Sequence, residues 1–203
     1  MKAILARVEH CERLGNVLSR AFVHDPVCSY VFSTPERRLK KMQWIYMHWL
    51  RVLIARNGVY TLPELSGAVL WHRPETGVSV GLRDHVRAGF LPIIYLLRPT
   101  EQVRGLIAHQ DAVARMKRFL DRPHWVLDTL GVAPECHRKG VARALLQPAL
   151  EEADTARIPC FVNTHNGANV AFYEGFGFTC IHESPMRGTD IVVYSMRRPP
   201  AED

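Results

Sequence analysis

Cysteine and long apolar runs are scarce in this sequence. The five cysteines are odd in number, and no two have the spacing of metal ligands, so we expect neither a disulfide framework nor a metal site. The longest apolar run, residues 89–97, contains Pro92 and is too short to span a bilayer. The first residues lack the apolar core and cleavage site of a secretory signal. We therefore expect a cytoplasmic protein with reduced thiols.

The sequence has a small excess of positive charge. The net charge is +6 over 203 residues, and 47% of the residues are hydrophobic, which favours one globular domain over residues 1–203 and excludes a disordered chain. The basic residues are dispersed and lack the interleaved aromatic residues of single-strand nucleic-acid binders. Charge alone suggests a nucleic-acid binder as an alternative. We expect neither nucleic acid nor a membrane as partner, and a monomer or homodimer.

Hydrophobic periodicity divides the chain into strands and helices in an order typical of a mixed α/β (α+β) fold with a central sheet. In the first half it predicts an edge strand (residues 2–8), a helix (9–22), an apolar connection (26–33) and a second helix (35–55). A hairpin (59–62 with 68–72) and two further helices (82–98 and 101–119) follow. In the second half it predicts two strand–helix units followed by a hairpin of residues 179–182 with 191–196.

The first strand–helix unit, residues 124–150, carries the strongest local pattern. A strand-like run over 124–132 leads into a basic turn at 137–140, and apolar residues then recur at helical spacing. A turn at a helix start presents free backbone N–H groups and the positive end of the helix dipole. Gly140 lets a ligand approach the backbone closely. The segment therefore predicts a phosphate-binding cup.

The second strand–helix unit follows at residues 158–178. Residues 159–164 have the pattern of a buried strand, and residues 169–174 that of a short helix, which the glycines at 175 and 177 end. Two adjacent strands that each lead into a helix indicate a parallel pair that is open at one end. A ligand can lie in such an opening.

Together the two units resemble the acetyl-CoA site of GNAT-type N-acetyltransferases. The family's Gln/Arg-x-x-Gly-x-Gly/Ala loop matches residues 137–142, with His137 in place of the usual first residue. Its second motif, an Asn followed by Phe-Tyr and then Gly-Phe, matches Asn169, Phe172, Tyr173, Gly177 and Phe178. Chain length and the Met-Arg-Arg segment at 196–198 are most similar to the puromycin N-acetyltransferase type. The motifs cover residues 124–198, and the first half is similar only in organisation.

This resemblance implies a mostly antiparallel sheet, with one parallel strand pair splayed at the acetyl-CoA site and helices on both faces. Residues 124–198 would bind acetyl-CoA, and residues 1–123, with a helical insertion at about 82–119, would form the acceptor side. The resemblance assigns most of the diphosphate binding to backbone groups. The residues that it implies in cofactor binding are Leu130, Gly131, Val132, His137, Arg138, Lys139, Gly140, Val141, Ala142, Arg143, Asn169 and Phe172.

Acetyl transfer needs a proton donor for the departing thiolate and a proton acceptor for an ammonium group. The resemblance assigns the donor role to Tyr173. A tyrosine with a pKa of about 10 is protonated at neutral pH and can therefore donate a proton. The puromycin type carries a glutamate where this chain has Asn163, which cannot accept a proton. Asp128 and His165 are the candidate acceptors, and a chain of waters is the alternative.

The acceptor amine is expected to contact polar and aromatic residues of both halves, namely Asp25, Tyr30, Trp71, His72 and Asn163. The expected function is acetyl-CoA-dependent transfer of an acetyl group to the primary amine of a small molecule, by direct attack in a ternary complex. Two alternatives stay open. One is an acetyltransferase for protein lysines or N-termini, and the other is a non-catalytic acyl-CoA-binding sensor.

Overall fold

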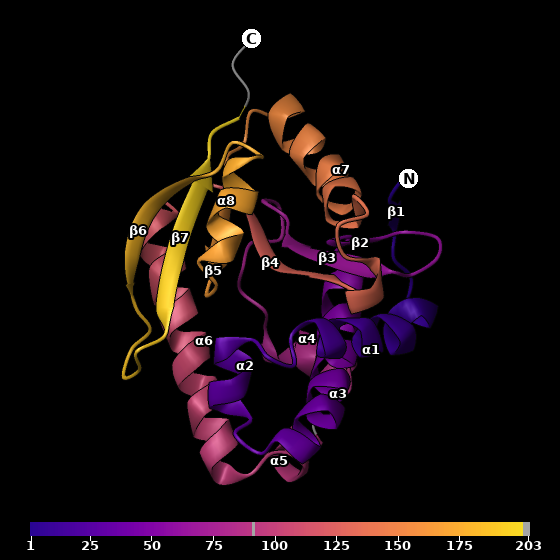
Figure 1. Cartoon of the computed structure of the whole chain (residues 1–203), viewed down its shortest axis with the longest axis vertical. Coiled ribbons are helices and arrows are strands. Elements are labelled where there is room, and N and C mark those ends of the chain that lie inside the picture. Colours follow the sequence, from indigo (N-terminus) through magenta and orange to yellow (C-terminus); the bar gives the residue numbers. More distant parts are fainter. Residues whose placement is uncertain (91, 201–203) are drawn as a thin grey trace.

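The computed structural model describes residues 1–90 and 92–200. A seven-stranded sheet with the order β1-β2-β3-β4-β5-β7-β6 forms its centre (Figure 1). The strands are β1 (Ile4–Leu5), β2 (Val59–Thr61), β3 (Gly67–His72), β4 (Trp125–Val132), β5 (Cys160–Thr164), β6 (Thr179–Pro185) and β7 (Val192–Arg198). All neighbours are antiparallel except β4 and β5. The predicted mixed α/β fold is therefore confirmed.

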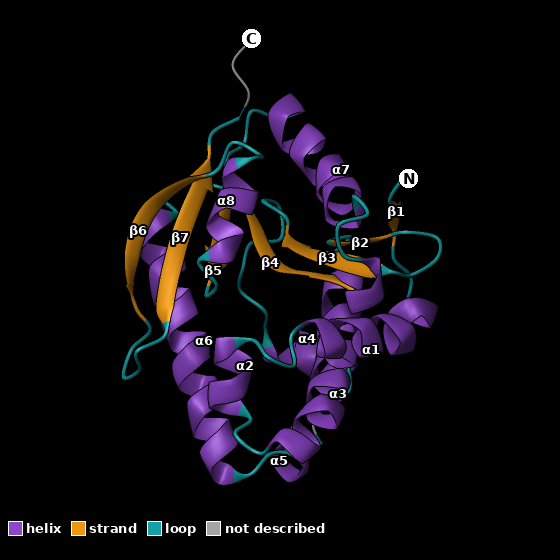
Figure 2. Ribbon diagram, in the orientation of Figure 1, coloured by secondary structure: helices purple, strands orange, loops and turns teal. Residues whose placement is uncertain are grey.

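Helices cover both faces of the sheet (Figure 2). They are α1 (Cys11–Ala21), α2 (Pro26–Val31), α3 (Pro35–Ile54), α4 (Leu82–Arg87), α5 (Ile93–Leu96), α6 (Pro99–Phe119), α7 (Val141–Thr155) and α8 (Ala168–Glu174), with short 3-10 turns at Val8–His10 and Pro134–Cys136. The apolar faces of α7 and α8 pack on one side of the sheet. Those of α1 and α3 pack on the other side, where α6 also lies and stacks Phe119 on Phe161 of β5.

Two expectations about the first half are corrected. Residues 26–33 were expected to form a connection, but α2 occupies most of them, because Asp25 accepts hydrogen bonds from the N–H groups of Val27 and Cys28 at 2.9 and 3.0 Å. An aspartate cap followed by proline is a strong helix start. The single helix expected over 82–98 is instead divided into α4 and α5. That range crosses residue 91, which lies outside the described residues.

Helix α6 is fixed to the rest of the protein near both of its ends. Close to its start, Glu101 accepts a hydrogen bond of 2.7 Å from Lys41 of α3, and both side chains are buried. Near its end, Arg115 donates to the Ser184 hydroxyl and to the Pro185 carbonyl of β6, both at 2.8 Å. These contacts hold α6 against α3 and the β6–β7 hairpin, and so define one wall of the site described below.

Candidate active site

The turn between β4 and α7 has the geometry of an anion-binding site. Arg138 and Gly140 adopt left-handed backbone conformations, with φ of +59° and +77°, and Gly140 stands at the N-cap of α7. Glycine is the residue that adopts this conformation without strain. The first N–H groups of α7 have no partner within the helix, and they coincide with the positive end of its dipole. A helix start of this kind binds phosphate groups.

A cavity of about 740 Å³ opens beside this turn and is called the large cavity below. The end of α1, the start of α2, the end of β4, the turn and α8 enclose it, and its volume is typical of small-molecule sites. It brings together most of the residues expected to bind the cofactor, namely Leu130, Gly131, Val132, His137, Arg138, Gly140, Val141, Ala142, Arg143, Asn169 and Phe172. Lys139 is exposed and does not line it.

Strand β4 loses its parallel partner halfway along its length. Only residues 125–127 pair with residues 160–162 of β5. Further along, the N–H of Ala133 donates to the carbonyl oxygen of Ser66, the residue before β3, at 2.8 Å, and backbone groups alternate along a strand. Leu130 and Val132 therefore direct their N–H and C=O groups toward the side from which β5 has turned away. This open edge confirms the splayed parallel pair, and it borders the large cavity.

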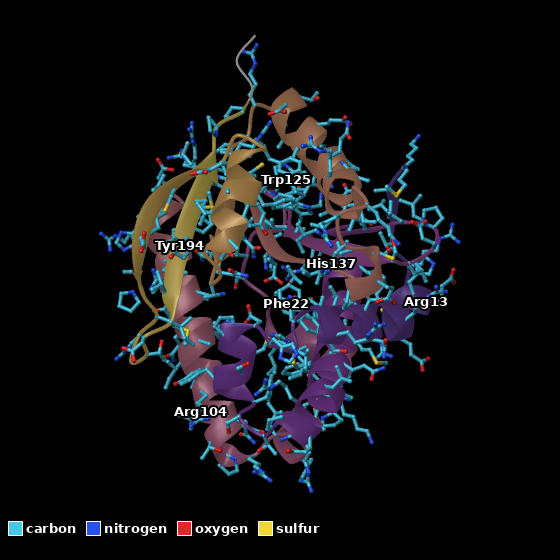
Figure 3. The ribbon with its side chains drawn as sticks, viewed as in Figure 1. Arg13, Phe22, Arg104, Trp125, His137 and Tyr194 are labelled. Carbon is cyan, nitrogen blue, oxygen red and sulfur yellow. The ribbon has the colours of Figure 1, made fainter. Side chains whose placement is uncertain are left out.

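One backbone group of this open edge already has a partner. Nε2 of His137 lies 3.1 Å from the carbonyl oxygen of Val132, and a neutral imidazole with its proton on Nε2 donates to that oxygen. In the view of Figure 3, His137 and Phe22 lie near the centre, and His137 is exposed. A ligand amide that pairs with the open edge has to compete with His137 for the Val132 oxygen.

The register between β3 and β4 shifts at Asp128. Neighbouring residues of β3 pair with Leu127 and Thr129, so Asp128 is the extra residue of a β-bulge. Simple alternation along a strand would place Asp128 on the same face as Leu130 and Val132, but the structure places it on the opposite face. The bulge reverses the alternation, so Leu127 and Leu130 both pack on the α7 side, whereas Asp128 contacts α3 on the other side.

Three side chains surround the Asp128 carboxylate. The indole N–H of Trp49 and the Thr129 hydroxyl donate to Oδ2 at 2.7 and 2.8 Å, and Nε2 of His72 lies 3.4 Å from Oδ1. Burial raises the pKa of Asp128, but the hydrogen bonds from His72, Trp49 and Thr129 outweigh it, so the pKa lies below its ordinary value. Asp128 is therefore ionised at neutral pH. His72 is buried behind this carboxylate and lines neither cavity.

A second cavity, of about 200 Å³, lies between α6 and the sheet and is called the small cavity below. Asp128, Asn163 and His165 line it together, although 37 positions separate the first from the last. The Ser195 hydroxyl donates to Oδ1 of Asn163 at 2.8 Å. His165 directly follows β5, and burial lowers its pKa, against the smaller opposite effect of Asp25. The imidazole is therefore neutral at neutral pH.

The two cavities adjoin where β4 and β5 separate. Three segments contribute neighbouring residues to both of them. On β4, residues 126–128 line the small cavity and residues 130–132 the large one. At the start of α2, Pro26 lines the large cavity and Val27 the small one. After β5, His165 lines the small cavity and Asn166 the large one.

Tyr173 of α8 lines the large cavity and is 6% exposed. Its ring packs against Phe172 and Phe178, with centroid distances of 5.2 and 5.7 Å. Burial raises the pKa of Tyr173 well above its ordinary value. The hydroxyl therefore keeps its proton at neutral pH and can donate it.

Besides His72, two further residues expected in the acceptor pocket lie elsewhere. Trp71 is fully buried on the α7 side, where its ring meets Trp125 edge-on at 6.0 Å. Tyr30 lies under the guanidinium of Arg104, 5.3 Å from the ring centroid, and lines neither cavity. Large aromatic side chains serve the core as readily as a pocket, and the strand pattern alone does not separate the two. Asp25 lines the large cavity while its carboxylate caps α2.

The sequence reading missed other residues of the site. Phe22 lines the large cavity from the end of α1, and Asp111 and Arg115 line the small one from α6. Trp49 reaches Asp128 across 79 positions of the chain. A turn motif such as residues 137–140 is local and can be found in a sequence. These contacts join positions that are far apart in the chain, so residue spacing in the sequence does not predict them.

Comparisons with known proteins agree with this fold. Residues 100–199 match the family of acetyltransferase (GNAT) domains. Over its whole length the chain is similar in fold to a histone acetyltransferase HPA2 and related acetyltransferase from Corynebacterium glutamicum, with 17% identity, a TM-score of 0.63 and 97% of that chain covered. An arylalkylamine N-acetyltransferase 2 from Aedes aegypti has 11% identity and a TM-score of 0.60, with 98% of each chain covered.

A third similar structure contains a ligand. It is the PaiA N-acetyltransferase from Thermoplasma acidophilum in complex with coenzyme A, with 14% identity and a TM-score of 0.55. The alignment covers 98% of each chain. At these identities the three structures establish the common fold.

Proposed function

We propose that this chain transfers the acetyl group of acetyl-CoA to the primary amine of a small molecule, because residues 100–199 match the family of acetyltransferase (GNAT) domains. The observation that carries this proposal is the pair of adjoining cavities. A long thioester and an amine can enter from opposite sides and meet where β4 and β5 separate. Holding both reactants at one junction favours direct attack in a ternary complex, because orientation lowers the barrier.

The large cavity suits a diphosphate carried on an amide-containing arm. The N–H groups at the start of α7 bind the diphosphate, with Arg138 and Arg143 adding positive charge. Leu130 and Val132 pair with the amides of the arm through their free backbone groups, after His137 has released the Val132 oxygen. Acetyl-CoA supplies an activated acetyl thioester at this position. A backbone N–H of the open edge polarises its carbonyl group.

Asp128 and His165, two titratable groups of the small cavity, are suited to different tasks. Asp128 has a lowered pKa and stays ionised, so it binds an ammonium group well but accepts a proton poorly. His165 also has a lowered pKa, and its imidazole is therefore neutral and ready to accept the ammonium proton at neutral pH. We assign binding of the amine to Asp128 and removal of its proton to His165.

Tyr173 is assigned the role of proton donor to the departing thiolate. Replacing it with phenylalanine is expected to lower kcat about 100-fold, at the low end of acid–base effects, because a thiol with a pKa of about 8.5 leaves with little help. The affinity for coenzyme A should stay within about 3-fold of the wild type, since the ring that packs against Phe172 is retained. Steady-state kinetics and calorimetry measure the two quantities. Phe178→Leu, which alters the packing but keeps the hydroxyl, is the matched control.

Amine-dependent release of the coenzyme A thiol tests the proposed function directly. Purified protein is incubated with acetyl-CoA and a panel of small amines, and mass spectrometry identifies the acetylated product. Tight binding of coenzyme A without thiol release from any amine would contradict catalysis and favour an acyl-CoA sensor. Acetylation of lysine peptides in preference to small amines would favour a protein acetyltransferase. The small volume of the small cavity, which α6 bounds on one side, supports the small-molecule proposal over that alternative.

A further inference from the structure

The small cavity has a size that limits the acceptor. Its volume is about 200 Å³, below the range of ordinary drug-sized sites. An apolar cavity of about 150 Å³ holds one benzene molecule. The small cavity therefore has room for one six-membered ring, or an aliphatic chain of that bulk, together with a short aminoalkyl arm. A nucleoside joined to an amino acid is several times larger.

The lining of the small cavity combines polar side chains near its junction with the large cavity and apolar side chains of α6. Asp128 and His165 lie at the junction with the large cavity, where transfer takes place. Ala108, Ala112 and Met116 line it along one side of α6. An amine whose nitrogen lies at Asp128 thus places its carbon skeleton against the small side chains of α6. The two alanines leave the space that the skeleton fills.

The charges of the lining favour a cation and disfavour a carboxylate. Asp111 and Asp128 are two acids of this cavity, Asp25 stands at its junction with the large one, and Arg115 is its one arginine among the described residues. Every nitrogen of Arg115 is already engaged. Nε donates to Asp111 at 2.6 Å, and the two terminal nitrogens donate to β6. A substrate carboxylate would find no free cation and would face the Asp128 carboxylate.

We propose that the acceptor is a compact primary monoamine with an apolar body of about one ring and no carboxylate. This inference rests on the proposed function and adds the substrate class. Amino acids are rejected because like charges are brought together. Long polyamines are rejected because their second ammonium would lie beside Ala108, Ala112 and Met116, where the Asp111 carboxylate is already paired with Arg115. Ala112 is the specificity-determining residue, since a larger side chain there occupies the place of the ring.

The experiment compares four amines by two readouts. Phenethylamine, phenylalanine, pentane-1,5-diamine and ethylamine are tested for acetylation, and for binding to the coenzyme A-loaded protein by calorimetry. We expect kcat/KM for phenethylamine to exceed that for phenylalanine and for the diamine by about 100-fold. Ala112→Leu should raise the KM for phenethylamine about 10-fold or more and leave that for ethylamine within about 3-fold. Ala114→Leu, an exposed position on the same helix, should change neither value.

The possible outcomes separate this inference from the proposed function. Acetylation of phenylalanine or the diamine as fast as phenethylamine would overturn the inference while the function stands. An unchanged phenethylamine KM in Ala112→Leu would also overturn it. If phenethylamine binds selectively, and binding is lost in Ala112→Leu, but no amine is acetylated, the substrate class stands and the proposed catalysis fails. If none of the four amines binds or reacts, the inference is wrong.

Discussion

Replacing His165 with glutamine is expected to lower kcat roughly 1,000-fold, within the range of general-base residues. Glutamine is similar in size and polar but cannot accept a proton. The coenzyme A affinity should be unchanged, because His165 lines the small cavity and not the large one. Stopped-flow or steady-state kinetics, with calorimetry of coenzyme A binding, gives both numbers.

The pH dependence of the same variant gives an independent readout. The base must be neutral to act, so kcat/KM of the wild-type enzyme should fall as the pH decreases through the pKa of His165. That pKa is lowered, so the midpoint should lie below about 6.5. Asp128 does not produce this limb, because its pKa is lowered from an ordinary value that is already more acidic. In His165→Gln the limb should disappear.

A surface histidine provides the control for this prediction. His109 lies on the exposed side of α6, outside both cavities. His109→Gln should retain wild-type kcat and the wild-type acidic limb. A His165→Gln enzyme with at least one third of the wild-type kcat and an unshifted pH profile would assign proton removal to another group, such as bound water.

The second large effect concerns stability. Glu101→Gln is expected to lower the free energy of unfolding by about 3–5 kcal/mol, because it leaves the buried Lys41 ammonium without a counter-ion. Glutamine still accepts the hydrogen bond from the backbone N–H of Arg98, so the start of α6 keeps its cap. Chemical denaturation measures the change, and a fall in Tm of roughly 6–20 °C should accompany it.

Two further variants decide whether the loss comes from the unpaired charge. Lys41→Met combined with Glu101→Leu removes both charges and should recover most of the lost stability, because apolar replacements of a buried pair are often neutral. The exposed pair of Arg20 and Glu135 is the matched comparison, and Glu135→Gln should cost less than about 1 kcal/mol. A Glu101→Gln protein as stable as Glu135→Gln would contradict the argument.

Most elements of the fold could be predicted from local pattern. The hairpin of β2 and β3, the strand–helix units and the last hairpin each have an apolar period bounded by turn residues, which is the signal that a sequence displays most clearly. Helix α2 was not predicted, because six residues form too few turns to display a helical period of apolar residues. Its cap, Asp25 followed by Pro26, was the signal that identified it in retrospect.

The candidate site was predicted unevenly, for a physical reason. Residues 137–143 form a cup through their own backbone, so consecutive residues describe it completely. The small cavity, which we propose holds the acceptor, is built from α2, α6, β4, β5 and the β6–β7 hairpin, whose relative positions depend on packing. The bulge at Asp128 is also invisible in the sequence. It follows from the register with β3, which strand alternation cannot supply.

That bulge has a consequence for how β4 tolerates change in length. Its one extra residue reverses the inward and outward alternation of side chains between the two ends of the strand. Leu127 and Leu130, three positions apart, therefore both contribute to the core beside α7. Deleting one residue there would restore simple alternation, and every side chain at one end of the strand would move to the opposite face of the sheet. A substitution at this point alters one side chain, whereas a deletion would exchange core and solvent along half of β4.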